Sequence, residues 1–74
     1  MFTAQDIKNA IKTANVDVNP ESIPVNTDFK DAGLDSLDVF NIFVEIESLI
    51  GGEIPDSEYE KLQSIDAVLQ YINA

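Results

Sequence analysis

The sequence predicts an all-α fold: a small four-helix bundle with three principal helices, one short helix and a long first loop. Two observations support this prediction. Apolar residues recur at helical spacing in three stretches, and a residue that can cap a helix precedes each stretch. No stretch convincingly shows the alternation of a strand. With 74 residues and an apolar fraction of 45%, the chain has room for one small core, so we expect a single domain over residues 1–74.

The first helix is expected to begin after Thr3, which can form a capping box with Asp6, while Phe2 is placed for a hydrophobic staple. The apolar face of this helix comprises Ile7, Ala10, Ile11 and Ala14. The connection from Val16 to Leu34 is long for a compact domain. We therefore expect its apolar side chains to pin it across the core, namely Val16, Val18, Ile23, Val25, Phe29 and Leu34.

The long connection contains Asn19-Pro20, which predicts a short helical turn with Asn19 as its cap and Pro20 in the first position. The second principal helix is predicted to begin at Asp35-Ser36-Leu37-Asp38 and to end near Ile50, because Gly51-Gly52 supply a stop. Its core face is expected to comprise Val39, Phe43, Ile46 and Ile50, with Ile42 beside them.

Asp35 and Asp38 have a structural explanation. Asp35 is a good N-cap, Asp38 stands at the third helical position, and both charges favour the positive end of the helix dipole. Capping alone is a sufficient reason for both acids. They carry functional information only in combination with other features of the same helix.

Leu37, Phe40 and Val44 lie on the side of this helix that carries Ser36, away from the core face. Exposed apolar residues with carboxylates around them are typical of a contact surface. The alternative is that the long loop covers these three side chains. We favour a docking face centred on Ser36.

The C-terminal third predicts one short and one longer helix. The segment Glu53–Asp56 should be extended, with Asp56 capping a short helix that ends near Leu62. Ser64 caps the last helix, whose apolar face comprises Ile65, Val68, Leu69 and Ile72. We interpret both tyrosines as packing residues.

The charge is strongly negative and unevenly distributed. The net charge is −10, and residues 28–60 hold ten acidic residues against Lys30 alone. Such a potential repels phosphate backbones, which argues against nucleic-acid binding, and it favours association with basic protein surfaces. No apolar run is long enough to span a membrane, and the N-terminus lacks the regions of a secretory signal. We expect a cytoplasmic protein, monomeric and not inserted in a membrane.

Ser36 has no partner that would make it a catalytic nucleophile. A serine needs a base to remove its proton, and the chain has no His, no Cys and no Arg. The flanking aspartates are weak bases at neutral pH. We therefore expect Ser36 to be a hydroxyl that another enzyme modifies. Two alternatives are an acidic interaction module without modification and a calcium-binding domain, but the sequence has no calcium-loop motif, so we expect no dedicated metal site.

Three segments resemble the acyl carrier protein family. Gly33-Leu34-Asp35-Ser36-Leu37-Asp38 is similar to the family's attachment motif. Glu53-Ile54-Pro55-Asp56 and Tyr71-Ile72-Asn73 are similar to the corresponding parts of free-standing bacterial carriers. The likeness runs through residues 6–73 and includes size, acidity and helix order.

This resemblance implies that Ser36 receives a 4′-phosphopantetheine arm from a phosphopantetheinyl transferase (holo-carrier synthase). The thiol of the arm would hold acyl groups as thioesters and present them to acyl-transferring, condensing or acyl-activating enzymes. The resemblance also implies acidic contacts to basic patches on these partners, at Asp35, Asp38, Glu47, Asp56 and Glu60. The implied apolar contacts are Leu37, Phe40, Val44 and Ile54.

The sequence departs from the family pattern at several positions, and these departures bear on which pathway the carrier serves. Housekeeping fatty-acid carriers have acidic residues where this chain has Asn41, Ser48 and Leu49. Phe40 is bulkier than the family's small aliphatic residue, and the segment 29–36 is one residue shorter. We therefore favour a carrier for a specialised lipid or secondary-metabolite pathway, such as a polyketide pathway. The alternatives are a housekeeping fatty-acid carrier and an aminoacyl carrier; Asp35 argues against the latter, which has a neutral pair before its serine.

Overall fold

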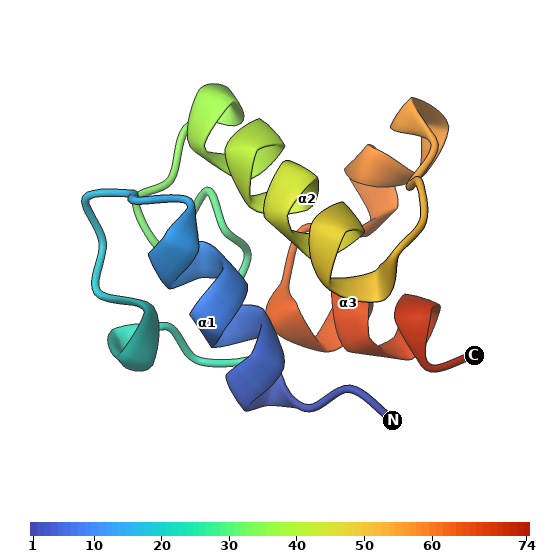
Figure 1. Cartoon of the computed structure of the whole chain (residues 1–74). Helices are drawn as coiled ribbons and strands as arrows, with labels where there is room; N and C mark the ends of the chain where they lie inside the picture. Colours follow the sequence, from blue (N-terminus) through green and yellow to red (C-terminus); the bar gives the residue numbers. More distant parts are fainter.

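The computed structural model describes residues 1–74, and its only regular elements are helices (Figure 1). Its elements are α1 (Ala4–Thr13), the 3-10 turn η1 (Pro20–Ser22), α2 (Ser36–Ile50), the 3-10 helix η2 (Asp56–Lys61) and α3 (Ile65–Ile72). The predicted all-α architecture of three principal helices, one short helix and a long first loop is therefore confirmed. No helix combines the length and the apolar character that a membrane span requires.

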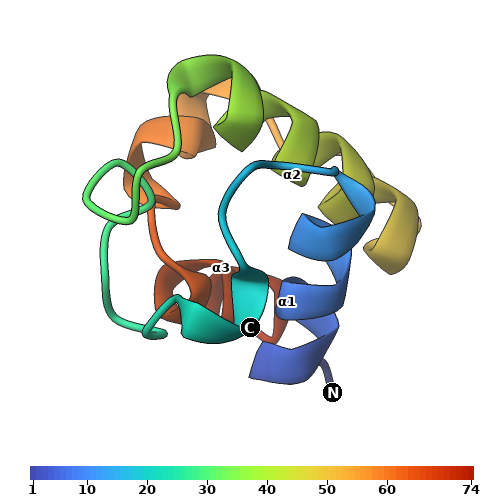
Figure 2. The same ribbon diagram turned by 90° about the vertical axis from the view of Figure 1, so that its left-hand side faces the viewer.

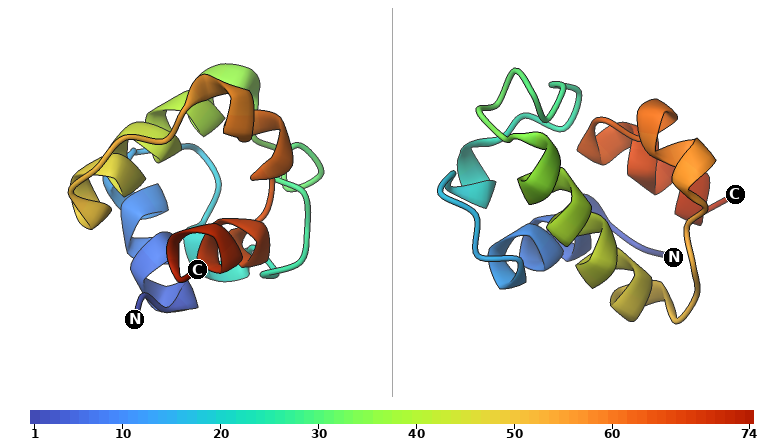
Figure 3. Two further views of the ribbon diagram at one scale, coloured as in Figure 1. Left: turned by 90° about the vertical axis from the view of Figure 1, so that its right-hand side faces the viewer. Right: turned by 90° about the horizontal axis from the view of Figure 1, so that it is seen from above.

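Helix α1 packs against both α2 and α3, and α2 lies across the top of the molecule in Figure 1. The two ends of the chain meet beside α3. The Phe2 N–H donates to Asn73 Oδ1 and the Asn73 side-chain amide donates to the Phe2 carbonyl, each at 2.9 Å. The left view of Figure 3 shows the two termini on the same side of the molecule.

One core receives side chains from all three α-helices and from the connections between them. Its members are Ile7, Ala10, Ile11, Ile23, Phe29, Leu34, Val39, Ile42, Phe43, Ile46, Ile54, Leu62, Ile65 and Val68. No polar or charged residue is buried. The predicted core face of α2 needs one correction, because Ile42 is fully buried whereas Ile50 is only half-buried. Ile50 lies in the last turn, beside the exposed Gly51, and therefore at the edge of the core.

The connection from Val16 to Leu34 wraps around one side of the bundle (Figure 2). As predicted, buried apolar side chains pin it, namely Ile23, Phe29 and Leu34. Two backbone hydrogen bonds fasten it to the segment before and at the start of α3. The Phe29 N–H donates to the Gln63 carbonyl at 2.7 Å, and the Asp66 N–H donates to the Val25 carbonyl at 2.8 Å. The expectation for Val25 is wrong, because its side chain is exposed and only its backbone carbonyl holds the loop here.

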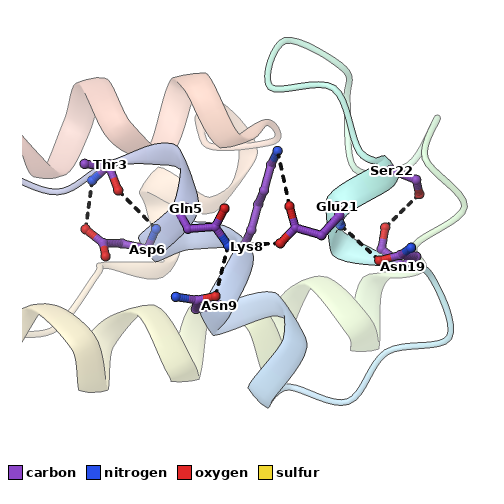
Figure 4. Close-up of polar contacts among 8 residues, drawn as sticks. All are labelled: Thr3, Gln5, Asp6, Lys8, Asn9, Asn19, Glu21 and Ser22. Atoms are coloured by element: carbon purple, nitrogen blue, oxygen red, sulfur yellow. Dashed lines mark hydrogen bonds and ion pairs between the residues drawn. The ribbon is translucent and has the colours of Figure 1, made fainter.

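The short turn η1 is capped as predicted and is tied to α1 (Figure 4). Asn19 Oδ1 accepts from the Glu21 N–H at 3.1 Å. The Glu21 carboxylate in turn accepts from the Gln5 side-chain amide at 2.9 Å and lies 4.0 Å from Lys8 Nζ. These contacts lie at or near the surface and contribute little stability each, but they hold η1 beside the N-terminal half of α1.

The cap of α1 also agrees with prediction. Thr3 Oγ1 accepts from the Asp6 N–H at 3.3 Å, and Asp6 Oδ2 accepts from the Thr3 N–H at 2.9 Å (Figure 4). Ser64 caps α3 by accepting from the Ala67 N–H at 3.1 Å. The prediction that Asp56 caps the short helix is wrong. Pro55 occupies the cap position without a side-chain bond, and Asp56 is the first helical residue.

The two tyrosines differ in their surroundings. The Tyr59 ring stacks on Phe43 with the ring centroids 4.4 Å apart, so its packing role is confirmed. Tyr71 is exposed, which contradicts the packing role expected for it. Tyr59 therefore connects η2 to the core face of α2.

Candidate functional site

Helix α2 begins with a capping box made by two aspartates. The Asp38 N–H donates to Asp35 Oδ1 at 2.8 Å, and the Asp35 N–H donates to Asp38 Oδ2 at 3.3 Å. Gly33 precedes this start with a φ of 96°, a left-handed conformation that favours glycine. The structural role expected of both acids is thereby confirmed, and their charges lie at the positive end of the helix dipole.

Ser36 is the first residue of α2, directly after the cap. It is exposed, and it takes no part in the capping bonds, which Asp35 and Asp38 make. The fold therefore makes no use of the Ser36 hydroxyl. An enzyme that docks on this end of α2 can reach it.

Ser36 lines an open pocket of about 510 Å³. The other lining residues come from the end of the long loop, from α2 and from the segment before α3: Lys30, Gly33, Leu34, Asp35, Val39 and Gln63. Lys30 and Gln63 are site residues that the sequence did not predict. In the sequence, Lys30 stands out because it is the only cation between residues 28 and 60. Nothing in the sequence marks Gln63, because it reaches the pocket through tertiary contacts, among them the hydrogen bond from the Phe29 N–H to its carbonyl.

Beyond Ser36, α2 exposes four large apolar side chains; Leu49 lies near the end of the helix, and we call the other three the apolar flank: Leu37, Phe40 and Val44. Their exposed fractions are 67%, 49% and 43%. The alternative that the long loop covers them is therefore wrong. Instead, the long loop passes around the side of the bundle (Figure 2), and the apolar flank lies next to Ser36 along the helix.

Two of the expected partner contacts need correction. Ile54 is only 2% exposed, so its side chain is not an accessible apolar contact. Glu47 is half-buried, and its Oε2 accepts from the Ile54 N–H at 2.7 Å. After the left-handed Gly51 the chain turns back toward the core, inserts Ile54 and engages one Glu47 oxygen internally. Asp56 and Glu60 are exposed on η2.

The carboxylates of Glu47 and Asp56 also affect the pKa of Tyr59. Burial, followed by the charges of the Glu47 and Asp56 carboxylates, raises the pKa of Tyr59 above its ordinary value of 10.0. The phenol therefore stays protonated at neutral pH and is no candidate for a base. The structure also contains no group of three or more His, Cys, Asp or Glu side chains placed to hold a metal ion.

Comparison with known proteins gives matches that cover nearly the whole chain. Residues 5–72 match the family model described as "Phosphopantetheine attachment site". Over 73 residues the chain is 38% identical to an acyl carrier protein of Wolinella succinogenes, covering 97% of this chain and 95% of that protein. It is 35% identical to an acyl carrier protein of Lactobacillus acidophilus over 77 residues, covering 99% of this chain and 96% of that protein. On the strength of these matches and of its helical order, the chain belongs to the acyl carrier protein family.

Proposed function

We propose that this chain carries acyl groups as thioesters on a 4′-phosphopantetheine arm attached to Ser36. The observation that carries the proposal is the free, exposed hydroxyl at the first position of α2, beside an open pocket. Both neighbouring aspartates have a structural use in the cap, whereas the serine has none. Within the matched attachment-site domain, this serine is therefore the one that supports modification best.

The residues around Ser36 fit such an arm. The hydroxyl is accessible for a phosphodiester bond, and the pocket of about 510 Å³ offers space next to it. When bound, the arm supplies a thiol, a group that this cysteine-free chain lacks. Attachment joins Ser36 Oγ to the phosphorus that bears the pantetheine in coenzyme A, and the nucleotide part of coenzyme A leaves. The serine proton goes to a base of the transferase, because the chain offers none.

The apolar flank and the exposed acids support docking of basic partner enzymes. Asp35, Asp56 and Glu60 are exposed, and so is the apolar flank, which begins two residues after Asp35 on α2. Charge speeds the encounter, and apolar contact at the centre of an interface supplies affinity. In this proposal the protein is a cytoplasmic, monomeric unit that enzymes modify and use.

For the pathway we favour specialised lipid or secondary-metabolite synthesis. Asn41, Ser48 and Leu49 are exposed on α2, so this helix offers a partner less negative charge than a carrier with acids there. Housekeeping fatty-acid synthesis is the alternative. If our proposal holds, the holo protein is a poor substrate for housekeeping condensing enzymes, and Asn41→Asp with Ser48→Glu improves it. Wild-type turnover equal to that of a housekeeping carrier favours the alternative.

The attachment itself is tested by mass spectrometry. The apo protein is incubated with coenzyme A and a broad-specificity phosphopantetheinyl transferase. We expect a gain of one phosphopantetheinyl group, and no gain in Ser36→Ala. The matched control is Ser48→Ala, another exposed serine of α2, which should be modified like the wild type. Modification of Ser36→Ala, or none of the wild type, contradicts the proposal.

A further inference from the structure

Lys30 is an unusual residue in its surroundings. It is the only cation between residues 28 and 60, a range that carries ten acids. Lys30 is exposed. The two ion pairs of the structure are formed by Lys8 and Lys61, so Lys30 has no carboxylate within 4.0 Å of its ammonium. A lysine that stays unpaired among so many carboxylates is available to an anion from outside the chain.

Lys30 also lines the pocket that Ser36 lines. Gly33 separates the two in sequence, and its left-handed φ of 96° turns the end of the loop into α2. Gln63 also lines the pocket; its side-chain amide donates to the Tyr59 carbonyl, and its own carbonyl accepts from the Phe29 N–H. Gln63 is therefore held in place by hydrogen bonds at both its side chain and its backbone.

A phosphodiester on Ser36 would place a negative charge between Asp35 and Asp38, and like charges in such proximity repel one another. A cation within the same pocket offsets this repulsion. An ammonium binds a phosphate oxygen through a charge-assisted hydrogen bond, and lysine is well suited to this because it acts as a compact point charge. The apolar part of the lining, Leu34 and Val39, suits the methyl groups that follow the phosphate in the arm.

We propose that this pocket holds the first part of the arm, with the Lys30 ammonium against the phosphodiester and the arm's geminal methyl groups against Leu34 and Val39. This inference rests on the proposed attachment at Ser36. It assigns to Lys30 a role in positioning the arm after attachment, and it concerns the resting holo protein, apart from any docked enzyme.

The test uses NMR on the holo protein, made in parallel as wild type, Lys30→Gln, Lys30→Arg and Lys12→Gln. Lys12 is the matched control, because it is exposed, forms no ion pair and lies on α1 away from the pocket. We expect nuclear Overhauser contacts from the geminal methyl groups to Leu34 and Val39 in the wild type. In Lys30→Gln the ratio of pocket-bound to free arm should fall by about 1.4- to 5-fold, the range for loss of an exposed ion pair. Lys30→Arg should restore it and Lys12→Gln should leave it unchanged.

The ³¹P resonance of the phosphodiester on Ser36 gives a second measure of the contact with Lys30. In the wild type its chemical shift should change as NaCl is added, because salt screens an exposed ion pair, and in Lys30→Gln this dependence should be weaker. Equal methyl contacts and equal salt dependence in wild type and Lys30→Gln overturn the inference. This failure is distinct from that of the proposed function, since the mass of each sample shows beforehand whether Ser36 bears the arm.

Discussion

Helices α1 and α2 begin in the same way. Thr3 and Asp6 form a capping box at α1, and Asp35 and Asp38 form one at α2, with both reciprocal hydrogen bonds present in each. An acid three residues after a cap is thus a local folding device that this chain uses twice. Its presence beside Ser36 says nothing about function by itself.

The two helix starts differ at the first helical residue and in what surrounds it. This residue is Ala4 in α1 and Ser36 in α2. Residues 1–27 have a net charge of −1, whereas residues 28–60 have a net charge of −9. The apolar flank follows Ser36, and no comparable row of large exposed apolar side chains follows Ala4. The information about function therefore lies in the hydroxyl, the flank and the charge, and the following predictions test each of these against α1.

The largest effect is expected from moving the serine between the two caps. Ala4→Ser places a hydroxyl at the first helical position of α1, directly after a capping box of the same geometry. In the double variant Ala4→Ser, Ser36→Ala we expect no phosphopantetheinyl transfer, since the flank and the acidic surface remain at α2. Intact mass after incubation with coenzyme A and the transferase is the measurement.

The single variant Ala4→Ser is the control for this transplantation, and it should gain one arm, on Ser36. If the double variant also gains one, a capped serine is a sufficient substrate. The comparison between the two helix starts would then lose its functional meaning.

The elements of this fold follow from local signals, which is why the sequence predicts them well. Thr3, Asn19, Asp35 and Ser64 cap the elements for which they were proposed. Each of these caps acts within three residues of its own position. The exposed apolar flank also follows from helical spacing, once the core face of α2 is recognised.

The surroundings of the site could not be predicted in the same way. Ile54 is buried and Glu47 is held by the Ile54 N–H because of the direction that the chain takes after Gly51. Gln63 reaches the pocket through its contact with Phe29. These positions depend on contacts between distant segments, and no short-range pattern encodes them.

The next effect concerns the caps themselves. Thr3→Ala and Asp35→Ala should each lower the free energy of unfolding by about 0.5–2 kcal/mol, because each removes an N-cap. Denaturant unfolding followed by circular dichroism measures this. Only Asp35→Ala should also slow the transferase, since only this cap lies beside the modified serine.

Asp35→Asn separates cap from charge, because Asn is as good an N-cap as Asp. We expect near wild-type stability together with slower modification, and a weaker dependence of the rate on salt. Wild-type kinetics in Asp35→Asn at every salt concentration would show that Asp35 serves the helix alone, as the acid of α1 does.

A smaller change in stability is expected from the apolar flank, which α1 lacks. Phe40→Gln should alter the free energy of unfolding by no more than about 0.5 kcal/mol, because the side chain is half exposed and stands outside the core. It should nevertheless raise the KM of the transferase for the carrier. Tyr71→Gln, a change at another exposed aromatic, is the matched control and should leave KM unchanged. An unchanged KM in both variants would exclude a role of Phe40 in docking this enzyme.

The smallest effect concerns the uneven charge of the two regions. Crowded carboxylates repel one another and destabilise the folded state, so Mg²⁺ should raise the melting temperature more than Na⁺ does at the same ionic strength. The gain should be a few degrees, since 1 kcal/mol corresponds to about 4–8 °C in a domain of this size. Asp56→Asn with Glu60→Gln removes two exposed charges from the acidic region and should raise the melting temperature without Mg²⁺ while reducing the response to it. Asp17→Asn, an exposed acid of the weakly charged region, should do neither. Because no group of acids is placed to hold a metal ion, the response should rise gradually with Mg²⁺ concentration, and a sharp, saturable response would instead indicate a specific site.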